Sequence, residues 1–271
     1  MVKLKLYALA FATSLTLTTT SVQAHTICTV VADASNNKIL MQEGNCTERT
    51  TPASTFKIAL SLMGFDSGFL KDAHTPTLTY KIGYPNWGGE AWRQPTDPTR
   101  WLKYSVVWYS QQVTQSLGMK RFANYTQRFN YGNADVAGDR RHDGLTHAWI
   151  DSSLQISPLE QIAFLTKVVN RKLPVSQHAF DMTNEITQIT QLDGWDIHGK
   201  TGTGFPANTD GSDNETHGWG WFVGWASHGG RTLVFARLIQ DDGEQPSTGA
   251  GLRARDAFLL DFPKSIAPLS H

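Results

Sequence analysis

The chain of 271 residues has no excess of either charge sign, because 24 Lys and Arg residues balance 24 Asp and Glu residues. Beyond its N-terminal segment it also has no run of basic residues. A chain with neither feature offers no electrostatic footprint for nucleic acid or for an anionic membrane. We therefore expect no nucleic-acid partner and favour a protein that acts on small molecules.

Metal-ligand patterns are also missing from the sequence. The 9 His residues show no spacing such as His-x-x-x-His. The polar stretch at 206–216 carries acidic residues but lacks the full ligand spacing of a Ca²⁺ loop. We expect a solvated loop there, and neither a metal site nor a metal cofactor in the protein.

An apolar export segment lies within residues 1–24. A basic start at Lys3 and Lys5 precedes an apolar stretch at 6–17, and small residues end at Ala24. This order is typical of a secretory signal peptide. The apolar stretch is shorter than the ~20 residues of a membrane span. We expect cleavage near His25, no membrane anchor and a periplasmic protein; an uncleaved anchor is the alternative.

Cysteine is scarce, with only Cys28 and Cys46 present. Both follow the expected cleavage site, in a compartment where disulfides survive. Apolar segments at 27–32 and 38–42 flank a turn-rich stretch at 33–37, which predicts a β-hairpin. If the two strands pair antiparallel across this turn, Cys28 and Cys46 lie opposite each other to within one residue. We expect them to form a disulfide; two free buried thiols are the alternative.

The most informative stretch is Ser54-Thr55-Phe56-Lys57, which opens an apolar run at 56–63. We predict a buried helix with Ser54 at its N-cap, where free N–H groups and the helix dipole suit an oxygen nucleophile. Lys57 lies one turn later on the same face. Apolar neighbours favour its neutral form, which can act as a base. Taken alone, Ser-x-x-Lys carries little weight and favours an ordinary capped helix with an exposed lysine.

Several further elements are predicted from periodicity and caps. An ordered irregular loop is expected at 75–98, and a helix starting at Ser157 has both an N-cap and a capping-box Glu160. Other expected helices span 99–117, 120–130, 183–189 and 252–262, and strands span 195–203, 218–226 and 232–240. This order predicts an α+β fold in which an antiparallel sheet from both chain ends, about 25–53 and 191–271, is flanked by helices, with an inserted helical region at about 54–190.

A second motif, Lys200-Thr201-Gly202, supports a catalytic role for the Ser54-Thr55-Phe56-Lys57 motif. Ser-x-x-Lys followed later in the chain by Lys-Thr-Gly is a signature of serine β-lactamases and penicillin-binding proteins. With Ser105-Val106-Val107, Tyr131-Gly132-Asn133 and Trp149, the ordered set resembles the class D, oxacillin-hydrolysing serine β-lactamases. Class A enzymes have Ser-Asp-Asn, and penicillin-binding proteins usually Ser-x-Asn, at the position of Ser105. The resemblance covers nearly all of residues 25–271 and implies the serine β-lactamase fold.

The resemblance also implies roles for individual residues. Ser54 is the expected nucleophile, and Lys57, carboxylated on its amine by CO₂ or bicarbonate, is the expected general base. Ser105 relays a proton to the ring nitrogen, with electrostatic support from Lys200. The expected substrate and pocket contacts involve Val107, Trp149, Thr201, Gly202, Thr203 and Arg253. Among these, the Trp149 N–H bonds the carbamate, the backbone N–H groups of Ser54 and Thr203 form the oxyanion hole, and Arg253 holds the substrate carboxylate.

The implied function is hydrolysis of β-lactam antibiotics, of penicillin and oxacillin type, which confers resistance. Two alternatives share the acylation chemistry but not the release step. One is a penicillin-binding transpeptidase or carboxypeptidase, and the other is a non-hydrolytic β-lactam sensor domain. Carbapenem hydrolysis stays open, as does the choice between monomer and homodimer.

Overall fold

The computed structural model describes residues 24–210, 212–244 and 248–266, so the predicted signal peptide lies outside the described residues except for Ala24. Within these ranges one antiparallel sheet has the strand order β2-β1-β6-β5-β4-β3. The strands are β1 (His25–Asp33), β2 (Ile39–Gly44), β3 (Gln188–Leu192), β4 (Trp195–Gly204), β5 (Trp219–His228) and β6 (Arg231–Gln240). Strands from both ends of the chain therefore share one sheet, which confirms the predicted α+β fold class.

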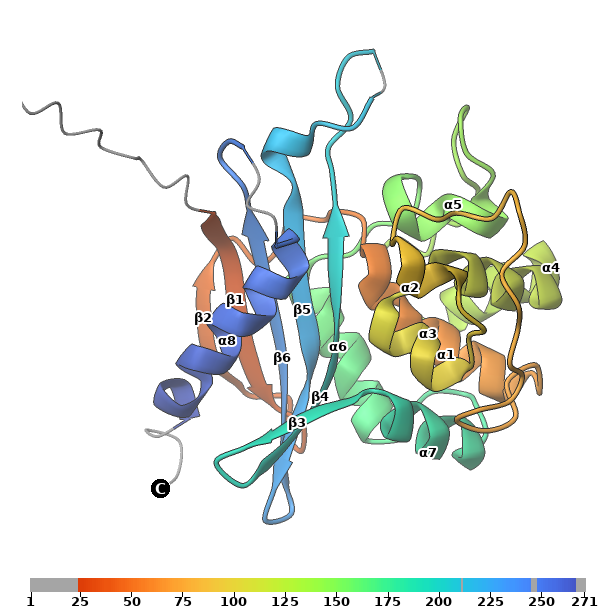
Figure 1. The fold of residues 1–271 in the computed structure, drawn as a ribbon. Helices are drawn as coiled ribbons and strands as arrows, with labels where there is room; N and C mark the ends of the chain where they lie inside the picture. Colours follow the sequence, from red (N-terminus) through yellow and green to blue (C-terminus); the bar gives the residue numbers. More distant parts are fainter. Residues whose placement is uncertain (1–23, 211, 245–247, 267–271) are drawn as a thin grey trace, which may run out of the picture.

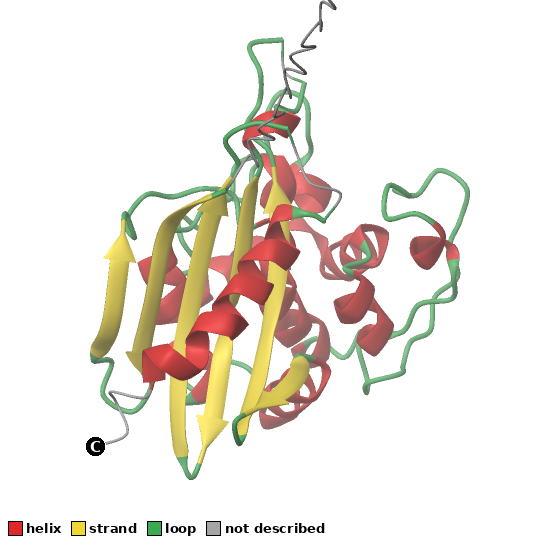
Figure 2. Cartoon of the chain, turned by 60° about the vertical axis from the view of Figure 1, so that its left-hand side comes forward, coloured by secondary structure: helices red, strands yellow, loops and turns green. Residues whose placement is uncertain are grey.

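The helices occupy both faces of this sheet. They are α1 (Lys57–Asp66), α2 (Glu90–Arg93), α3 (Pro98–Tyr104), α4 (Val107–Phe129), α5 (Gly144–Asp151), α6 (Pro158–Val169), α7 (Gln177–Ile186) and α8 (Ala250–Ile266), with short 3₁₀ helices η1 (Ala53–Phe56) and η2 (Glu215–His217). Helices α1 to α7 belong to the inserted helical region on one side (Figure 1), whereas α8 lies diagonally across the opposite face (Figure 2). Among the described residues, none of these helices combines the length and apolar character of a membrane span.

Strand β5 shows how one sheet supports two apolar cores. Its alternate residues Trp221 and Val223 are buried in the core shared with the helical region. Phe222 and Ala226 are buried in the second core, against Phe258 of α8. Because successive side chains point to opposite faces of a strand, a sheet that is covered on both sides reads as a continuous apolar run.

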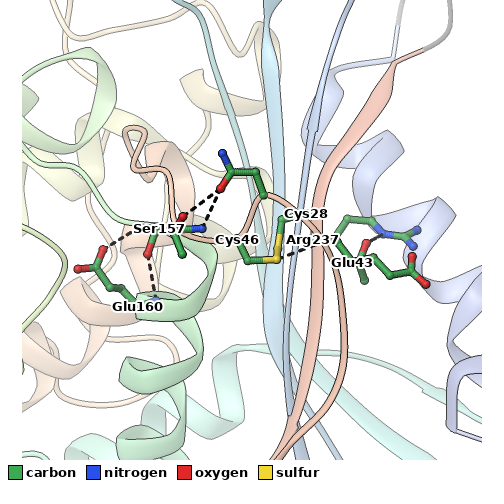
Figure 3. The surroundings of a disulfide bond; sticks show 9 residues. Cys28, Glu43, Cys46, Ser157, Glu160 and Arg237 are labelled. Carbon is green, nitrogen blue, oxygen red and sulfur yellow. Dashed lines mark hydrogen bonds between the residues drawn. A yellow bond between two sulfur atoms is a disulfide. The ribbon is translucent and has the colours of Figure 1, made fainter.

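The predicted hairpin at the N-terminus is present, and a disulfide joins Cys28 to Cys46 with 5.1 Å between their Cα atoms. Figure 3 shows this bond linking β1 to the segment after β2. The observed register pairs Cys28 with Gly44 rather than with Cys46. The second cysteine therefore lies two residues past its expected position, where the chain has turned back toward β1.

Helix α6 begins as predicted, with a capping box that Figure 3 includes: the Ser157 hydroxyl accepts from the Glu160 N–H, and the Glu160 carboxylate accepts from the Ser157 N–H. The start of α7 was predicted too late. That helix begins at Gln177, because Ser176 accepts from the Ala179 N–H and so caps it earlier. Residues 188–189, expected in the helix, belong instead to the unpredicted strand β3.

The expected helix at 99–117 is interrupted at Ser105. This residue has a left-handed backbone with φ of 59°, so α3 ends before it and α4 begins after it. A left-handed residue reverses the path of the chain and exposes its side chain at a corner between two helices. The loop at 75–98 is irregular and ordered, as predicted, with α2 as its one short helical turn in the described structure.

Candidate active site

Ser54 lies in η1, immediately before α1. The sequence predicted it as an N-cap, and this was wrong, because the chain is already helical there and the residue preceding α1 is Phe56. The bend occurs one residue earlier, at Ala53, whose φ is 47°. With no capping bond to make, the Ser54 hydroxyl faces the next turn.

The partner of Ser54 is Lys57, whose Nζ donates to Ser54 Oγ at 2.9 Å. The Lys57 side chain is 0% exposed. Burial holds its pKa well below the ordinary lysine value, and the nearby charge of Lys200 lowers it further. Burial thus favours the neutral form of Lys57, which can accept a proton from the hydroxyl that it touches.

The wall behind this pair is aromatic and dry. Trp149, from α5, is fully buried and stacks on Phe56 with 5.8 Å between ring centroids. Val107, the first residue of α4, is 5% exposed. The indole Nε1 of Trp149 has no hydrogen-bond acceptor among the residues that the structure describes. Such a donor is unusual, because buried polar groups are almost always satisfied.

Strand β4 closes the other side of the site with Lys200-Thr201-Gly202. A Cβ at Gly202 would lie 2.9 Å from the Pro52 carbonyl oxygen and 3.2 Å from the Ser54 nitrogen. The strand therefore passes so close to the Ser54 turn that glycine fits best at this point. Lys200 is 5% exposed and its Nζ donates to the Thr201 carbonyl at 2.9 Å. Burial lowers its pKa to about 7, with a further contribution from the charge of Arg255.

The free edge of β4 presents backbone N–H groups to the site. The Gly199 N–H donates to Thr187 at 2.9 Å, on the β3 side of the strand. Because N–H groups in an antiparallel strand alternate between its two edges, those of Thr201 and Thr203 point to the same side. In the described chain β3 pairs with β4 only as far as His198. The Thr203 N–H is thus on an uncovered edge, as an oxyanion donor must be.

These elements meet at a pocket of about 320 Å³. The residues predicted from the sequence that line it are Ser54, Ser105, Val107, Lys200, Thr201, Gly202 and Thr203. Trp87 and Trp92, from the irregular loop at 75–98, line it as well. The polar loop at 206–216 contributes no described residue to the lining.

Sequence reasoning missed part of the pocket wall. Lys103, Tyr104 and Leu252 line it without having been predicted. The only signal for the first two was their place directly before Ser105, which tells nothing about side-chain direction. Tyr131, of the Tyr131-Gly132-Asn133 motif, is buried and packs on Phe56 with 5.0 Å between ring centroids rather than lining the pocket.

Arg253, expected to hold the substrate carboxylate, is engaged by other groups of the protein in this structure. Its guanidinium donates to both carboxylate oxygens of Asp241, at 2.6 and 2.7 Å, and to the Thr248 carbonyl at 2.9 Å. Asp241 is 2% exposed, whereas the Arg253 side chain is 20% exposed. Arg253 is not among the described residues that line the pocket. In this structure the side chain therefore contacts the segment after β6, and its role in binding the substrate carboxylate stays a prediction.

Comparison of the sequence with known proteins shows the family to which the chain belongs. Residues 27–262 match the family model of the penicillin binding protein transpeptidase domain. The chain is 45% identical to β-lactamase OXA-9 of Klebsiella pneumoniae over 87% of this chain and 86% of that protein. It is 42% identical to β-lactamase OXA-1 of Escherichia coli over 78% and 75% of the two chains. The chain belongs to the class D β-lactamases.

The solved structure of the OXA-427 class D β-lactamase supports the same assignment. It matches 89% of this chain and 99% of its own, with a TM-score of 0.83 and 46% sequence identity. The protein is therefore a β-lactam hydrolase of the serine type. Among the described residues, no group of three or more His, Cys, Asp or Glu side chains is arranged to hold a metal ion.

Proposed function

We propose that this class D enzyme hydrolyses penicillins and oxacillin-type β-lactams through an acyl-enzyme on Ser54, with N-carboxylated Lys57 as the general base, and so confers antibiotic resistance. The observation that carries the proposal is the 2.9 Å contact between Ser54 Oγ and the Nζ of the fully buried Lys57. A neutral amine in that position is suited both to accepting a proton and to reacting with CO₂.

In acylation, Ser54 Oγ attacks the β-lactam carbonyl and transfers its proton to the Lys57 side chain. The backbone N–H groups of Ser54 and Thr203 stabilise the developing oxyanion. Ser105 then passes a proton to the ring nitrogen as the amide bond breaks. Lys200, buried beside it, supports this transfer electrostatically.

Carboxylation of Lys57 would supply a carbamate oxygen as the base in acylation and again in activating water for deacylation. The surroundings fit such a group. The unsatisfied Trp149 Nε1 provides a donor for an additional oxygen at this wall, and its apolar neighbours would protect a carbamate from protonation. The amine of Lys57 must be neutral to react, which its burial favours.

We also propose that the enzyme is exported to the periplasm. The signal-peptide pattern at residues 1–24 motivates this location. The Cys28–Cys46 disulfide supports it, because such bonds persist in oxidising compartments. Partition of the expressed protein between periplasmic and cytoplasmic fractions tests this part of the proposal.

The function itself is tested by following the hydrolysis of benzylpenicillin and oxacillin through the burst and the steady state. We expect many turnovers per enzyme molecule. Stoichiometric acylation without further product would contradict hydrolysis and favour the penicillin-binding or sensor alternative. Acylation and deacylation are thereby measured separately in one experiment.

A further inference from the structure

Gln161 of α6 is a buried polar side chain that the proposed chemistry leaves unused. Its amide Nε2 donates to Thr55 Oγ1 at 3.1 Å and to the Tyr131 hydroxyl at 3.3 Å, and both of these side chains are buried too. The two protons of the amide are thus both used. An apolar side chain of the same size could fill this space at little cost, so packing alone does not explain a glutamine here.

The Thr55 hydroxyl connects this amide to the backbone that precedes Ser54. Thr55 Oγ1 donates to the Pro52 carbonyl at 2.7 Å, and the Thr55 backbone N–H donates to the same oxygen at 3.1 Å. Because the hydroxyl proton goes to Pro52, its oxygen can accept from Gln161. The three residues form a chain of hydrogen bonds, in which successive bonds polarise and strengthen one another.

The turn before Ser54 needs such support, because Ala53 is not a glycine and yet has a φ of 47°. A backbone of this kind persists only where the surrounding structure holds it. Strand β4 holds the turn from one side, since Gly202 lies against the Pro52 carbonyl. The hydrogen bonds from Gln161 hold the same carbonyl from the side of α6. The orientation of the Ser54 peptide therefore depends on both.

Helix α6 has a fixed register relative to this turn, although the two are far apart in sequence. The Leu159 N–H donates to the Cys46 carbonyl at 3.1 Å, and Ile156 and Thr50 exchange two backbone hydrogen bonds at 2.9 and 3.2 Å. The start of α6 consequently lies beside the disulfide (Figure 3). These bonds join the helix to the chain just before the turn, and so bring Gln161, in the first turn of α6, to its partners.

We propose that Gln161 is a positioning residue for catalysis, which acts through Thr55 to fix the turn that presents the hydroxyl and the backbone N–H of Ser54. The inference rests on the proposed function, in which this N–H stabilises the oxyanion in both acylation and deacylation. An oxyanion donor is effective only if it is already in place when the charge develops. Loss of the Gln161 amide should therefore slow both steps and leave carboxylation of Lys57 unaffected.

The test is the variant Gln161→Met, which keeps the length and burial of the side chain without its amide. Acylation by benzylpenicillin is followed by rapid quench and intact mass at saturating bicarbonate. The rate constant refers to the molecules that react, and the amplitude gives the folded fraction. We expect the acylation and deacylation rate constants both to fall roughly tenfold, because small misplacements of reacting groups cost much rate. The bicarbonate concentration for half-maximal activity should stay that of the wild type.

Variants of Thr55 separate the hydrogen bond from the shape of the side chain. Thr55→Val removes the hydroxyl at nearly constant shape and should slow both steps about as much as Gln161→Met. Thr55→Ser keeps the hydroxyl and should recover most of the rate. The double variant Gln161→Met/Thr55→Val should be little slower than either single variant, since both substitutions break the same chain of hydrogen bonds.

Thr183→Val is a matched control. The buried Thr183 hydroxyl lies 3.0 Å from Ser61 Oγ, between α7 and α1 and away from the turn. This variant should lose thermal stability, as Thr55→Val does, but keep the wild-type rate constants. Wild-type rate constants in Gln161→Met, an equal loss in Thr183→Val, or a raised bicarbonate requirement in Gln161→Met would overturn the assignment. Acylation is observable without turnover, and peptide mapping locates the adduct, so a failure of hydrolysis or of Ser54 as nucleophile is recognised separately.

Discussion

The inner and outer walls of the active site differ in their access to water. On the inner wall Phe56, Lys57 and Trp149 are 0% exposed, whereas on the outer wall Trp87 is 65% and Leu252 41% exposed. The inner wall shifts the pKa of a lysine and protects a reactive group, which needs a dry environment. The outer wall lines a pocket that is open to solvent. The two walls therefore offer different conditions, a dry one behind Ser54 and a solvent-exposed one in front of it.

The largest effect is expected from Ser54→Ala, which removes the reacting atom from the inner wall. Acylation should fall by roughly 10⁴-fold or more, because a nucleophile has no substitute. The fold should survive, since only the hydrogen bond with Lys57, worth about 1 kcal/mol, is lost. Intact mass after incubation with benzylpenicillin measures the adduct, and thermal unfolding provides the control. An acylated Ser54→Ala protein would place the nucleophile elsewhere.

Trp149→Phe changes the inner wall more subtly, by removing the unsatisfied N–H and keeping most of the apolar surface. Deacylation should slow roughly 10- to 100-fold and acylation less, because one donor to the base is missing. The bicarbonate concentration needed for half-maximal activity should rise. Trp195→Phe is a matched control, since Trp195 packs against Phe262 in the core beneath α8. Equal bicarbonate dependence in the two variants would contradict the role of Trp149.

Lys200 lies between the two walls, and its pKa of about 7 links stability to pH. Between pH 7 and 10.5 the unfolded chain holds a proton on this lysine that the folded protein lacks. The free energy of unfolding therefore gains about 1.4 kcal/mol per pH unit from Lys200 as pH rises through this window. Lys200→Met should lose this contribution. Denaturant unfolding of both proteins at pH 7.5 and 9.5 measures the difference, and parallel profiles would show that Lys200 is charged in the folded state.

The smallest effect is expected at the outer wall, from Trp87→Ala. Trp87 packs on Trp92 with 5.2 Å between ring centroids, and little of it is buried. An aromatic contact of this kind contributes about 1 kcal/mol, so KM should change less than about tenfold. The bicarbonate dependence should stay that of the wild type, as measured by steady-state kinetics with and without added bicarbonate. A strong change in the bicarbonate dependence would contradict the independence of the two walls.

The sequence predicted the fold class and several residues that the structure brings together at one pocket, because their signals are local. Ser-x-x-Lys fixes a spacing of one helical turn, and the Ser157 capping box fixes the start of α6. The left-handed backbone at Ser105 was missed because the helical pattern continues on both sides of it. Strand β3 was missed because its five residues form a strand only beside β4.

The contacts of Arg253 could not be predicted, for a different reason. Arg253 and Arg255 are two residues apart in one helix, and the sequence contains no information on which flank faces β4. Only the packing of Ala254 and Phe258 against the sheet decides that Arg253 meets Asp241. Side-chain direction across a helix therefore depends on tertiary contacts, even where the motif itself is recognised correctly.

The central claim, that the buried Lys57 is carboxylated and acts as the base, is tested most directly by ¹³C NMR after incubation with ¹³C-labelled bicarbonate. The spectra are recorded for wild type and Lys57→Ala at a pH where the enzyme is active. We expect a carbamate signal in the wild type and none in Lys57→Ala. In the wild type both this signal and the activity should weaken as pH falls, because the amine becomes protonated. Fully active enzyme without a Lys57-dependent carbamate signal would contradict this claim.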